Sequence, residues 1–293
     1  MTDPEPSPVP PDRPRRPEEL EDWLNGRLYH PLSWRLARRL VPAGITPDMV
    51  SIIGAVMIML AAAAYGWLAS PWGVALGLAL HMSWHVFDGA DGDLARLRGG
   101  GSAHGELVDG ICDYAGHIVL YVTLGFLASA QIGVAGWGLM WAAGASRVVQ
   151  AAHYEGARRQ YQQAVYATPW LASTSAADPA EARHPFVIYY LWLTGLIVPH
   201  GAALTSAMRD PEHHSAIGTA MRAGRGGWLA GMSLLSANYR TLAVGAAMLA
   251  GRPHWYFLFE VVALNVVLAL SLRRVRAAFG AVLAQTVPAS TRR

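Results

Sequence analysis

The chain has 293 residues, of which 53% are hydrophobic and 15% charged, and its mean hydropathy is +0.24. This composition is too apolar for an ordinary soluble domain and indicates a polytopic membrane protein. The net charge of +3 rests on arginine, since the sequence has no lysine, and no arginine cluster is interleaved with aromatics, which argues against nucleic-acid binding. The single Cys112 excludes an internal disulfide and a cysteine-based metal site.

The N-terminal 41 residues divide into two parts. Residues 1–18 carry seven prolines among acids and arginines, which indicates a disordered tail and not a signal peptide. In residues 19–41 the apolar side chains recur about every four positions with arginines between them, and Pro31 interrupts the pattern. We expect two short amphipathic helices on the membrane surface here; the alternative is a solvated helix of a soluble segment.

Hydropathy predicts an all-α bundle of about six transmembrane helices between residues 45 and 275. Thr46 is the candidate N-cap of the first span, with Pro47 in the first helical position. The spans are expected at about 49–68, 72–94, 106–130, 134–154, 228–250 and 255–272. The connection 155–226, with a short apolar helix at about 186–198, is expected to be cytoplasmic or interfacial, and 276–293 a cytoplasmic tail.

Arginine asymmetry predicts the orientation. The expected turns near Ser70, Gln131 and Gly251 carry only Arg252, whereas the opposite ends of the spans and both termini hold nearly all the other arginines. Because positive residues stay on the cytoplasmic side, both termini and the loop 95–105 are expected to face the cytoplasm of an inner membrane.

Four carboxylates lie where the second and third spans meet. Asp88 and Asp91 are three residues apart, and Asp109 and Asp113 are four apart, so each pair lies on one face of a helix. Two such helices facing one another would bring four carboxylates to one point. Oxygen ligands without Cys or His suit a hard cation, namely magnesium, manganese or calcium.

The residues around the four carboxylates favour a phosphate ligand. Arg96 offers a forked donor for phosphate oxygens. Gly92 and Gly105 remove side chains where a ligand could approach the backbone. A cation, an arginine and two glycines together indicate a site for a nucleotide diphosphate.

The pattern Asp-x2-Asp-Gly-x2-Ala-Arg-x8-Gly-x3-Asp-x3-Asp, over residues 88–113, resembles the signature of the CDP-alcohol phosphotransferase family. Eight fixed positions match by chance roughly once in 10^10 starting points at average residue usage. The resemblance implies the roles of the fixed residues. It implies two divalent cations, Mg²⁺ or Mn²⁺, on Asp88, Asp91, Asp109 and Asp113, a general base in Asp113, and nucleotide contacts from Gly92, Ala95, Arg96 and Gly105.

The resemblance also implies the reaction. A CDP-linked alcohol has two phosphorus atoms, and the acceptor hydroxyl attacks the one that bears the alcohol. CMP then leaves. We expect the donor to be CDP-diacylglycerol and the acceptor a small polar alcohol in phospholipid synthesis; the alternative is transfer of a CDP-linked headgroup to a lipid alcohol such as diacylglycerol or ceramide. The family is typically homodimeric, and no nucleic-acid partner is expected.

Two other classes of protein compete with this interpretation. The run Asp-Gly-Ala-Asp-Gly-Asp suggests an EF-hand calcium loop, but the acids at 88, 91 and 93 do not fit the alternate spacing that the loop needs. A membrane divalent-cation transporter could line its path with acids, but transporters place them near the midplane of repeated halves, and this chain shows no repeat.

Polar residues outside the motif are candidates for the acceptor site. Arg147 lies in the expected fourth span and Arg240 in the fifth, where either could bind an acceptor phosphate or pair with a carboxylate. Glu260 and Asn265 in the sixth span are further candidates. Asp93 is expected to be exposed. The four histidines that flank the motif are expected to serve in packing or at the surface: His81, His85, His104 and His117.

Overall fold

The structure is a computed structural model of the chain and describes residues 17–68, 70–168, 185–229 and 231–287. Within these ranges the chain is helical and contains no strand, which confirms the all-α prediction. The expected disordered tail falls mostly on residues outside the described ranges. The elements are η1 Glu18–Leu20, η2 Asn25–Tyr29, α1 His30–Leu40, α2 Pro47–Trp67, α3 Pro71–Leu97, α4 Ala103–Ile132, α5 Val134–Tyr166, α7 Pro185–Ile197, α8 Gly201–Ala207, α9 Pro211–Leu229, η4 Met232–Leu235, α10 Ala237–Leu249, α11 Pro253–Leu258, η5 Phe259–Ala263 and α12 Leu264–Thr286.

Three helical stretches in the described part of the chain are long and apolar enough to cross a membrane: Pro47–Trp67, His104–Ile132 and Pro253–Thr286. They confirm that the protein is an integral membrane protein, and a six-span arrangement stays a prediction. The first stretch begins as expected, because the backbone N–H of Met49 donates to the Thr46 side chain and Pro47 opens α2.

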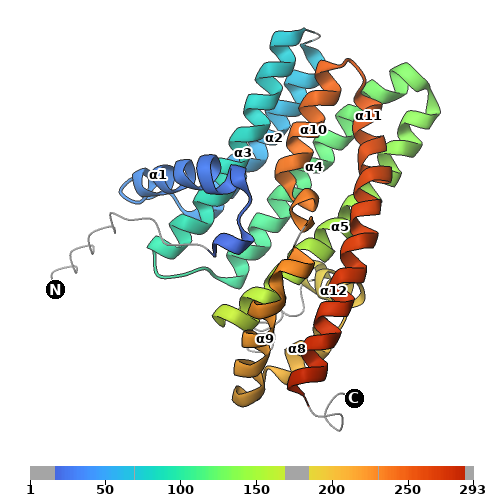
Figure 1. Cartoon of the computed structure of the whole chain (residues 1–293). Helices are drawn as coiled ribbons and strands as arrows, with labels where there is room; N and C mark the ends of the chain where they lie inside the picture. Colours follow the sequence, from blue (N-terminus) through green and yellow to red (C-terminus); the bar gives the residue numbers. More distant parts are fainter. Residues whose placement is uncertain (1–16, 69, 169–184, 230, 288–293) are drawn as a thin grey trace, which may run out of the picture. The chain divides into compact units, whose positions relative to one another are not determined.

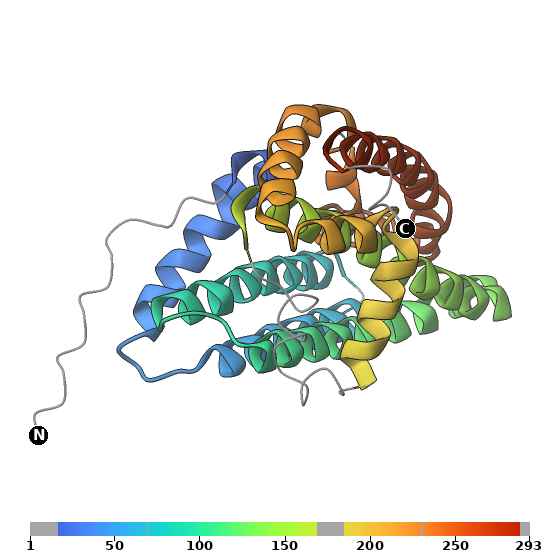
Figure 2. The same ribbon diagram turned by 90° about the horizontal axis from the view of Figure 1, so that it is seen from below.

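The chain forms two compact units, one of residues 1–63 and 79–120 and the other of residues 64–78 and 121–293. In the first unit, α1 runs across α3 (Figures 1 and 2). Ala37 of α1, Val50 of α2, and Ala90 and Leu94 of α3 form a small apolar core there. Arg35, Arg38 and Arg39 of α1 are exposed, whereas Trp34 and Ala37 are buried, so α1 is amphipathic.

The sequence predicted that Pro31 would divide the N-terminal segment into two short helices, but the structure shows no division there. Residues 23–40 form one continuous helical stretch in which the π-helical turn η2 directly precedes the proline. A proline has no N–H to donate and its ring crowds the carbonyl four residues earlier. The wider π turn accommodates both effects, so the helix continues through Pro31.

The second unit is built around the packing of α5, α9 and α12 (Figures 1 and 2). Trp228 of α9 lies between Tyr161 of α5 and Phe279 of α12, with ring centroids 5.7 and 5.1 Å away, and all three side chains are fully buried. Helices α5 and α9 approach closely at Gly218, where a Cβ would overlap the carbonyl oxygen of Ala164.

The expected fifth span at 228–250 is wrong at its start. Trp228 belongs to α9, which ends at Leu229. The chain turns at Gly231, whose φ of +82° favours glycine, and then continues into η4 and α10. Helix α10 has 13 residues, fewer than the ~20 needed for a full crossing. Helix α12 extends beyond the expected sixth span to Thr286, so the start of the expected C-terminal tail is helical.

Candidate metal centre and active site

Three of the four motif aspartates converge in the first unit. Asp88 comes from α3, and Asp109 and Asp113 lie one turn apart on α4. One carboxylate oxygen from each lies within 4.8 Å of the other two, and all three side chains are partly buried. Ligand oxygens around a cation at about 2.0–2.6 Å are separated by at most about 5 Å, so the cluster is the right size for one hard cation. Its oxygen-only donor set fits Mg²⁺ or Mn²⁺.

Asp91 has a different environment from the other three aspartates. It is buried, and the Ser51 hydroxyl of α2 donates a hydrogen bond of 2.6 Å to its Oδ2 atom. Asp91 also interacts with the side chains of Asp88 and Asp109. Ser51, which the sequence analysis did not single out, therefore orients a motif carboxylate next to the cluster.

Helix α3 runs without interruption from Pro71 to Leu97 through the whole Asp-Gly-Ala-Asp-Gly-Asp run. An EF-hand requires a 12-residue loop at this point, with a glycine at the sharp turn. The continuous helix therefore excludes the EF-hand alternative. It also explains why Asp88 and Asp91, three residues apart, can both face α4.

The expectation that Asp93 is exposed is wrong. Its side chain is 1% exposed and forms an i,i+3 ion pair with the guanidinium of Arg96. Arg96 itself is about half exposed, with 48% of its side chain accessible. A carboxylate cannot be buried at low cost without a charged partner, and the Arg96 pair supplies one. The pair also holds the guanidinium of Arg96 against α3.

Gly92 and Gly105 are not required by packing within the protein. A Cβ on Gly92 would lie 3.7 Å from the Arg96 guanidinium, and a Cβ on Gly105 would lie 3.4 Å from the Ser102 hydroxyl. Gly89 is different, because a Cβ there would lie 2.5 Å from the Ser33 hydroxyl of α1. A Cβ at Gly92 or Gly105 would therefore make only ordinary van der Waals contacts, so the protein's own packing does not account for glycine at these two positions.

These environments predict opposite effects of the same substitution at Gly89 and Gly92. We expect Gly89→Ala to lower the stability of the protein by about 1–3 kcal/mol, because Ser33 is buried and cannot move away. Gly92→Ala is expected to leave stability equal or slightly higher, since alanine favours a helix by up to about 1 kcal/mol, and to raise the KM for the CDP-linked donor. Thermal unfolding and donor KM measured on both variants check this. A donor KM unchanged in Gly92→Ala would contradict the nucleotide role of Gly92.

Comparison with known proteins identifies the family. Residues 44–220 match the family model described as CDP-alcohol phosphatidyltransferase. The chain belongs to the CDP-alcohol phosphatidyltransferase family. All eight motif positions and Arg147 lie within the matched range, whereas Arg240 and Glu260 lie beyond it.

Curated relatives include three phosphatidylinositol phosphate synthases. The one from Mycobacteroides abscessus is 36% identical over 118 residues, 39% of this chain and 49% of the relative. The one from Mycobacterium tuberculosis is 37% identical over 92 residues, 31% and 41% of the two chains. The one from Mycobacterium marinum is 39% identical over 79 residues, 27% and 32% of the two chains. The matched segments therefore span about half or less of each relative.

A buried polar network in the second unit contains both arginines proposed from the sequence. Glu260 is fully buried, and the Tyr121 and Tyr256 hydroxyls donate to its Oε1 atom at 3.0 and 2.6 Å. The Arg240 Nε atom lies 3.1 Å from the same oxygen, and an Arg147 guanidinium nitrogen lies 3.9 Å from it. Two cations therefore face one carboxylate, which leaves one positive charge in excess in this group.

The two arginines differ in the exposure of their side chains and in their contacts with the rest of the protein. Arg240 is 3% exposed and also donates to the Leu235 carbonyl and to the Gln150 side chain, at 3.0 and 2.6 Å. The Arg147 side chain is 18% exposed and lies over the Tyr121 ring, with its guanidinium carbon 5.7 Å from the ring centroid. Glu260 lies in the π-helical turn η5, an irregularity that is frequent at functional sites.

A layer of buried rings adjoins the aspartates in the first unit, and we call it the aromatic layer: Tyr29, His81, Trp84, His85 and His117. The expectation of packing roles holds for its three histidines, which are buried among rings, whereas His104 is exposed. Burial, with a smaller contribution from Asp22, raises the pKa of Tyr29 to about 12, so this ring stays neutral. Trp84, not singled out from the sequence, donates to Asp113.

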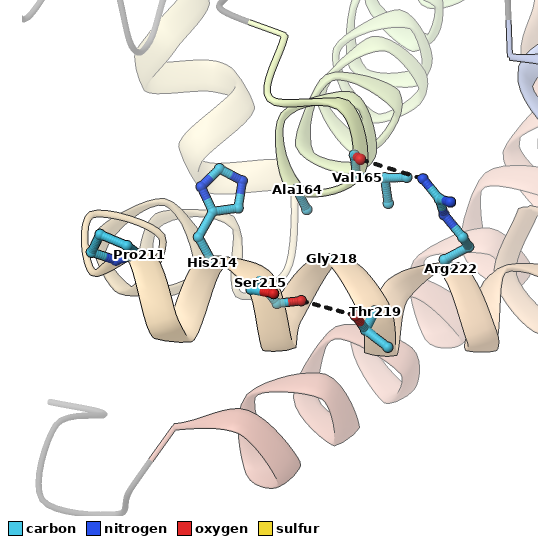
Figure 3. Close-up of a pocket in the computed structure, with 8 residues that line it drawn as sticks. All are labelled: Ala164, Val165, Pro211, His214, Ser215, Gly218, Thr219 and Arg222. Atoms are coloured by element: carbon cyan, nitrogen blue, oxygen red, sulfur yellow. Dashed lines mark hydrogen bonds between the residues drawn. The ribbon is translucent and has the colours of Figure 1, made fainter.

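A separate pocket in the second unit does not involve the motif. It has a volume of about 500 Å³ and lies between the C-terminal end of α5 and helix α9 (Figure 3). Its lining consists of Ala164, Val165, Pro211, His214, Ser215, Gly218, Thr219 and Arg222. The His214 ring and the Arg222 guanidinium donate to the backbone carbonyls of Gln163 and Val165 in the last turn of α5. Both side chains are therefore occupied by contacts within the protein.

Proposed function

We propose that the protein transfers a phosphatidyl group from CDP-diacylglycerol to a phosphorylated polyol such as inositol phosphate, and releases CMP. The observation that carries the proposal is the convergence of Asp88, Asp109 and Asp113, from the motif of the family, into one cluster of hard oxygen ligands. The relatives named phosphatidylinositol phosphate synthase support this acceptor. The active site and both termini face the cytoplasm in this proposal, where a soluble nucleotide would leave.

In the proposed reaction, the acceptor hydroxyl oxygen forms a bond to the phosphorus that carries diacylglycerol. The bond from this phosphorus to the bridging oxygen breaks, and CMP leaves with that oxygen. The proton of the acceptor hydroxyl passes to the Asp113 carboxylate. Arg96 contacts the phosphate oxygens of the nucleotide, and the backbone at Gly92 and Gly105 lets the nucleotide approach.

Asp88, Asp109 and Asp113 would hold a divalent cation, with Asp91 as the neighbouring ligand for a second one. When bound, the cations neutralise charge on the diphosphate and on the attacking and leaving oxygens. Without such charge compensation the four carboxylates would repel one another and the anionic substrate. As a free carboxylate Asp113 is a weak base, since the reference pKa of Asp is about 3.9.

Arg147 is the better candidate of the two arginines for the acceptor phosphate. Its pair with Glu260 is long, its side chain is partly accessible, and the network around Glu260 has one positive charge in excess. Arg240 forms the shorter ion pair with Glu260 and donates hydrogen bonds to Gln150 and the Leu235 carbonyl. We therefore assign the phosphate contact to Arg147, with Arg240 as the structural cation that pairs with Glu260.

This assignment predicts a selective kinetic effect. Arg147→Ala is expected to raise the KM for the phosphorylated acceptor by about 10- to 100-fold, because a charge-assisted contact to phosphate contributes about 1.5–3 kcal/mol. The KM for CDP-diacylglycerol should change little. Arg158→Ala, which removes an arginine of a partly exposed ion pair on the same helix, is the matched control. Equal rises in both KM values in Arg147→Ala would instead indicate a structural role.

The acceptor is tested by product identification. Purified protein in Mn²⁺ is supplied with CDP-diacylglycerol and, separately, inositol phosphate, glycerol phosphate, inositol, serine or choline, and the lipid products are identified by mass spectrometry. We expect a phosphatidylinositol phosphate product. A product only from CDP-choline or CDP-ethanolamine with diacylglycerol or ceramide would replace the proposed donor, and cation uptake into proteoliposomes without CDP compounds would favour a transporter. Size determination in detergent tests the homodimer that we also propose.

A further inference from the structure

Trp84 lies on the same face of α3 as Asp88, one turn earlier, and it meets the α4 face that carries Asp109 and Asp113. Its indole Nε1–H donates a hydrogen bond of 2.8 Å to Asp113 Oδ1. The facing sides of α3 and α4 therefore carry the carboxylates. One helical turn before Asp88, α3 also carries the tryptophan that is hydrogen-bonded to the Asp113 carboxylate.

The indole ring itself has little freedom to move. It is 4% exposed, and the His85 and His117 rings pack on it with centroids 4.4 and 4.7 Å away. On the α2 side it lies against Gly54, where even a Cβ would come within 3.3 Å of the indole. The His117 Nδ1–H donates to the backbone carbonyl of Asp113 at 2.7 Å, which fixes the imidazole ring that packs on the indole.

A carboxylate has two oxygens, and their positions are coupled by the planar group. A fixed donor on Oδ1 sets the rotation of the Asp113 side chain, while an Asp113 oxygen lies within 4.8 Å of oxygens from Asp88 and Asp109. The indole N–H is a donor only and cannot take up a proton, so it orients the carboxylate without competing for the proton of the acceptor.

We propose that Trp84 is a positioning residue, which holds the Asp113 carboxylate in the orientation needed to bind the cation and to accept the proton of the acceptor. The proposal rests on the function proposed above. Residues that orient metal ligands typically contribute 10- to 100-fold to metal affinity or activity, and small displacements of a reacting group have similar effects on rate.

The test compares Trp84→Phe with Trp34→Phe. Trp34 is a buried tryptophan of the same unit whose Nε1 atom has no hydrogen-bond partner among the described residues, so its variant is a matched control. Trp84→Phe is expected to lower kcat about 10- to 100-fold and to weaken Mn²⁺ binding, measured by electron paramagnetic resonance without substrate, about tenfold. The KM for CDP-diacylglycerol should stay near the wild-type value in both variants.

Site-specific replacement of Trp84 by benzothienylalanine, which keeps the ring shape but has no N–H, repeats the test if Trp84→Phe fails to fold. Equal kcat and Mn²⁺ affinity in the variants of Trp84 and Trp34 would overturn the positioning role. Wild-type protein that binds Mn²⁺ but releases no CMP would overturn the proposed reaction alone, because the Mn²⁺ comparison still tests Trp84.

Discussion

Asp113→Asn is expected to reduce CMP release by at least about 10³-fold, because it removes both a metal ligand and the group that accepts the proton of the acceptor. Asparagine has nearly the shape of aspartate and can still accept the Trp84 hydrogen bond on its carbonyl oxygen. The fold and the nucleotide contacts should therefore survive. Steady-state CMP release and equilibrium binding of a CDP compound, measured on the same preparation, check the prediction.

Asp210→Asn is the control for this substitution. Asp210 is exposed and accepts the first backbone N–H groups of α9, a capping role that asparagine performs equally well. Its turnover should match the wild type. Full activity in Asp113→Asn would refute the base assignment, and loss of nucleotide binding together with activity would mean that Asp113 acts on the donor.

Glu260→Gln is expected to lower the stability of the protein by about 3–5 kcal/mol, because removal of one partner leaves a buried charge uncompensated. Arg240 would then face a neutral amide at 3% exposure, with Arg147 nearby. For a domain of this size the apparent Tm should fall by roughly 10 °C. Thermal unfolding of detergent-purified protein, followed by tryptophan fluorescence, measures the shift.

Two further variants test whether the loss of stability in Glu260→Gln comes from the buried network or from the removal of any carboxylate charge. Glu155→Gln breaks the partly exposed i,i+3 pair with Arg158 and should shift the Tm little, since ion pairs near the surface contribute about 0–1 kcal/mol. Glu260→Gln combined with Arg240→Met should recover part of the loss, because the more deeply buried of the two cations is then removed and only the partly accessible Arg147 still faces the neutral amide. A Tm for Glu260→Gln equal to that of Glu155→Gln would contradict the importance of the network.

The sequence predicted the parts of the site that depend on helical spacing. Asp109 and Asp113 lie four residues apart on a helix whose apolar pattern is unambiguous, and the bounds of α2, α3 and α4 fall within a few residues of the expected spans. The glycines and Arg96 of the motif follow from the same register. Local spacing and hydropathy therefore suffice for the cluster of aspartates.

The rest depends on contacts between helices that no spacing rule encodes. The Trp84 and Ser51 hydrogen bonds to motif aspartates join residues 29 and 40 positions apart. Asp93 carries the same pattern as an exposed acid, and only its packing environment makes it a buried partner of Arg96. The continuous helix through Pro31 required a π turn, and the break at Gly231 occurred within an apolar run where hydropathy indicates a single span.

The most direct test of the proposed metal-dependent phosphotransfer is CMP release from CDP-diacylglycerol and inositol phosphate by the wild-type protein in the presence of a chelator, followed by addition of Mn²⁺ or Mg²⁺. We predict that the chelator stops CMP release and that either cation restores it, in the wild type but not in Asp113→Asn. CMP release that continues undiminished under chelation would contradict the assignment of Asp88, Asp109 and Asp113 as the metal centre of a phosphotransferase.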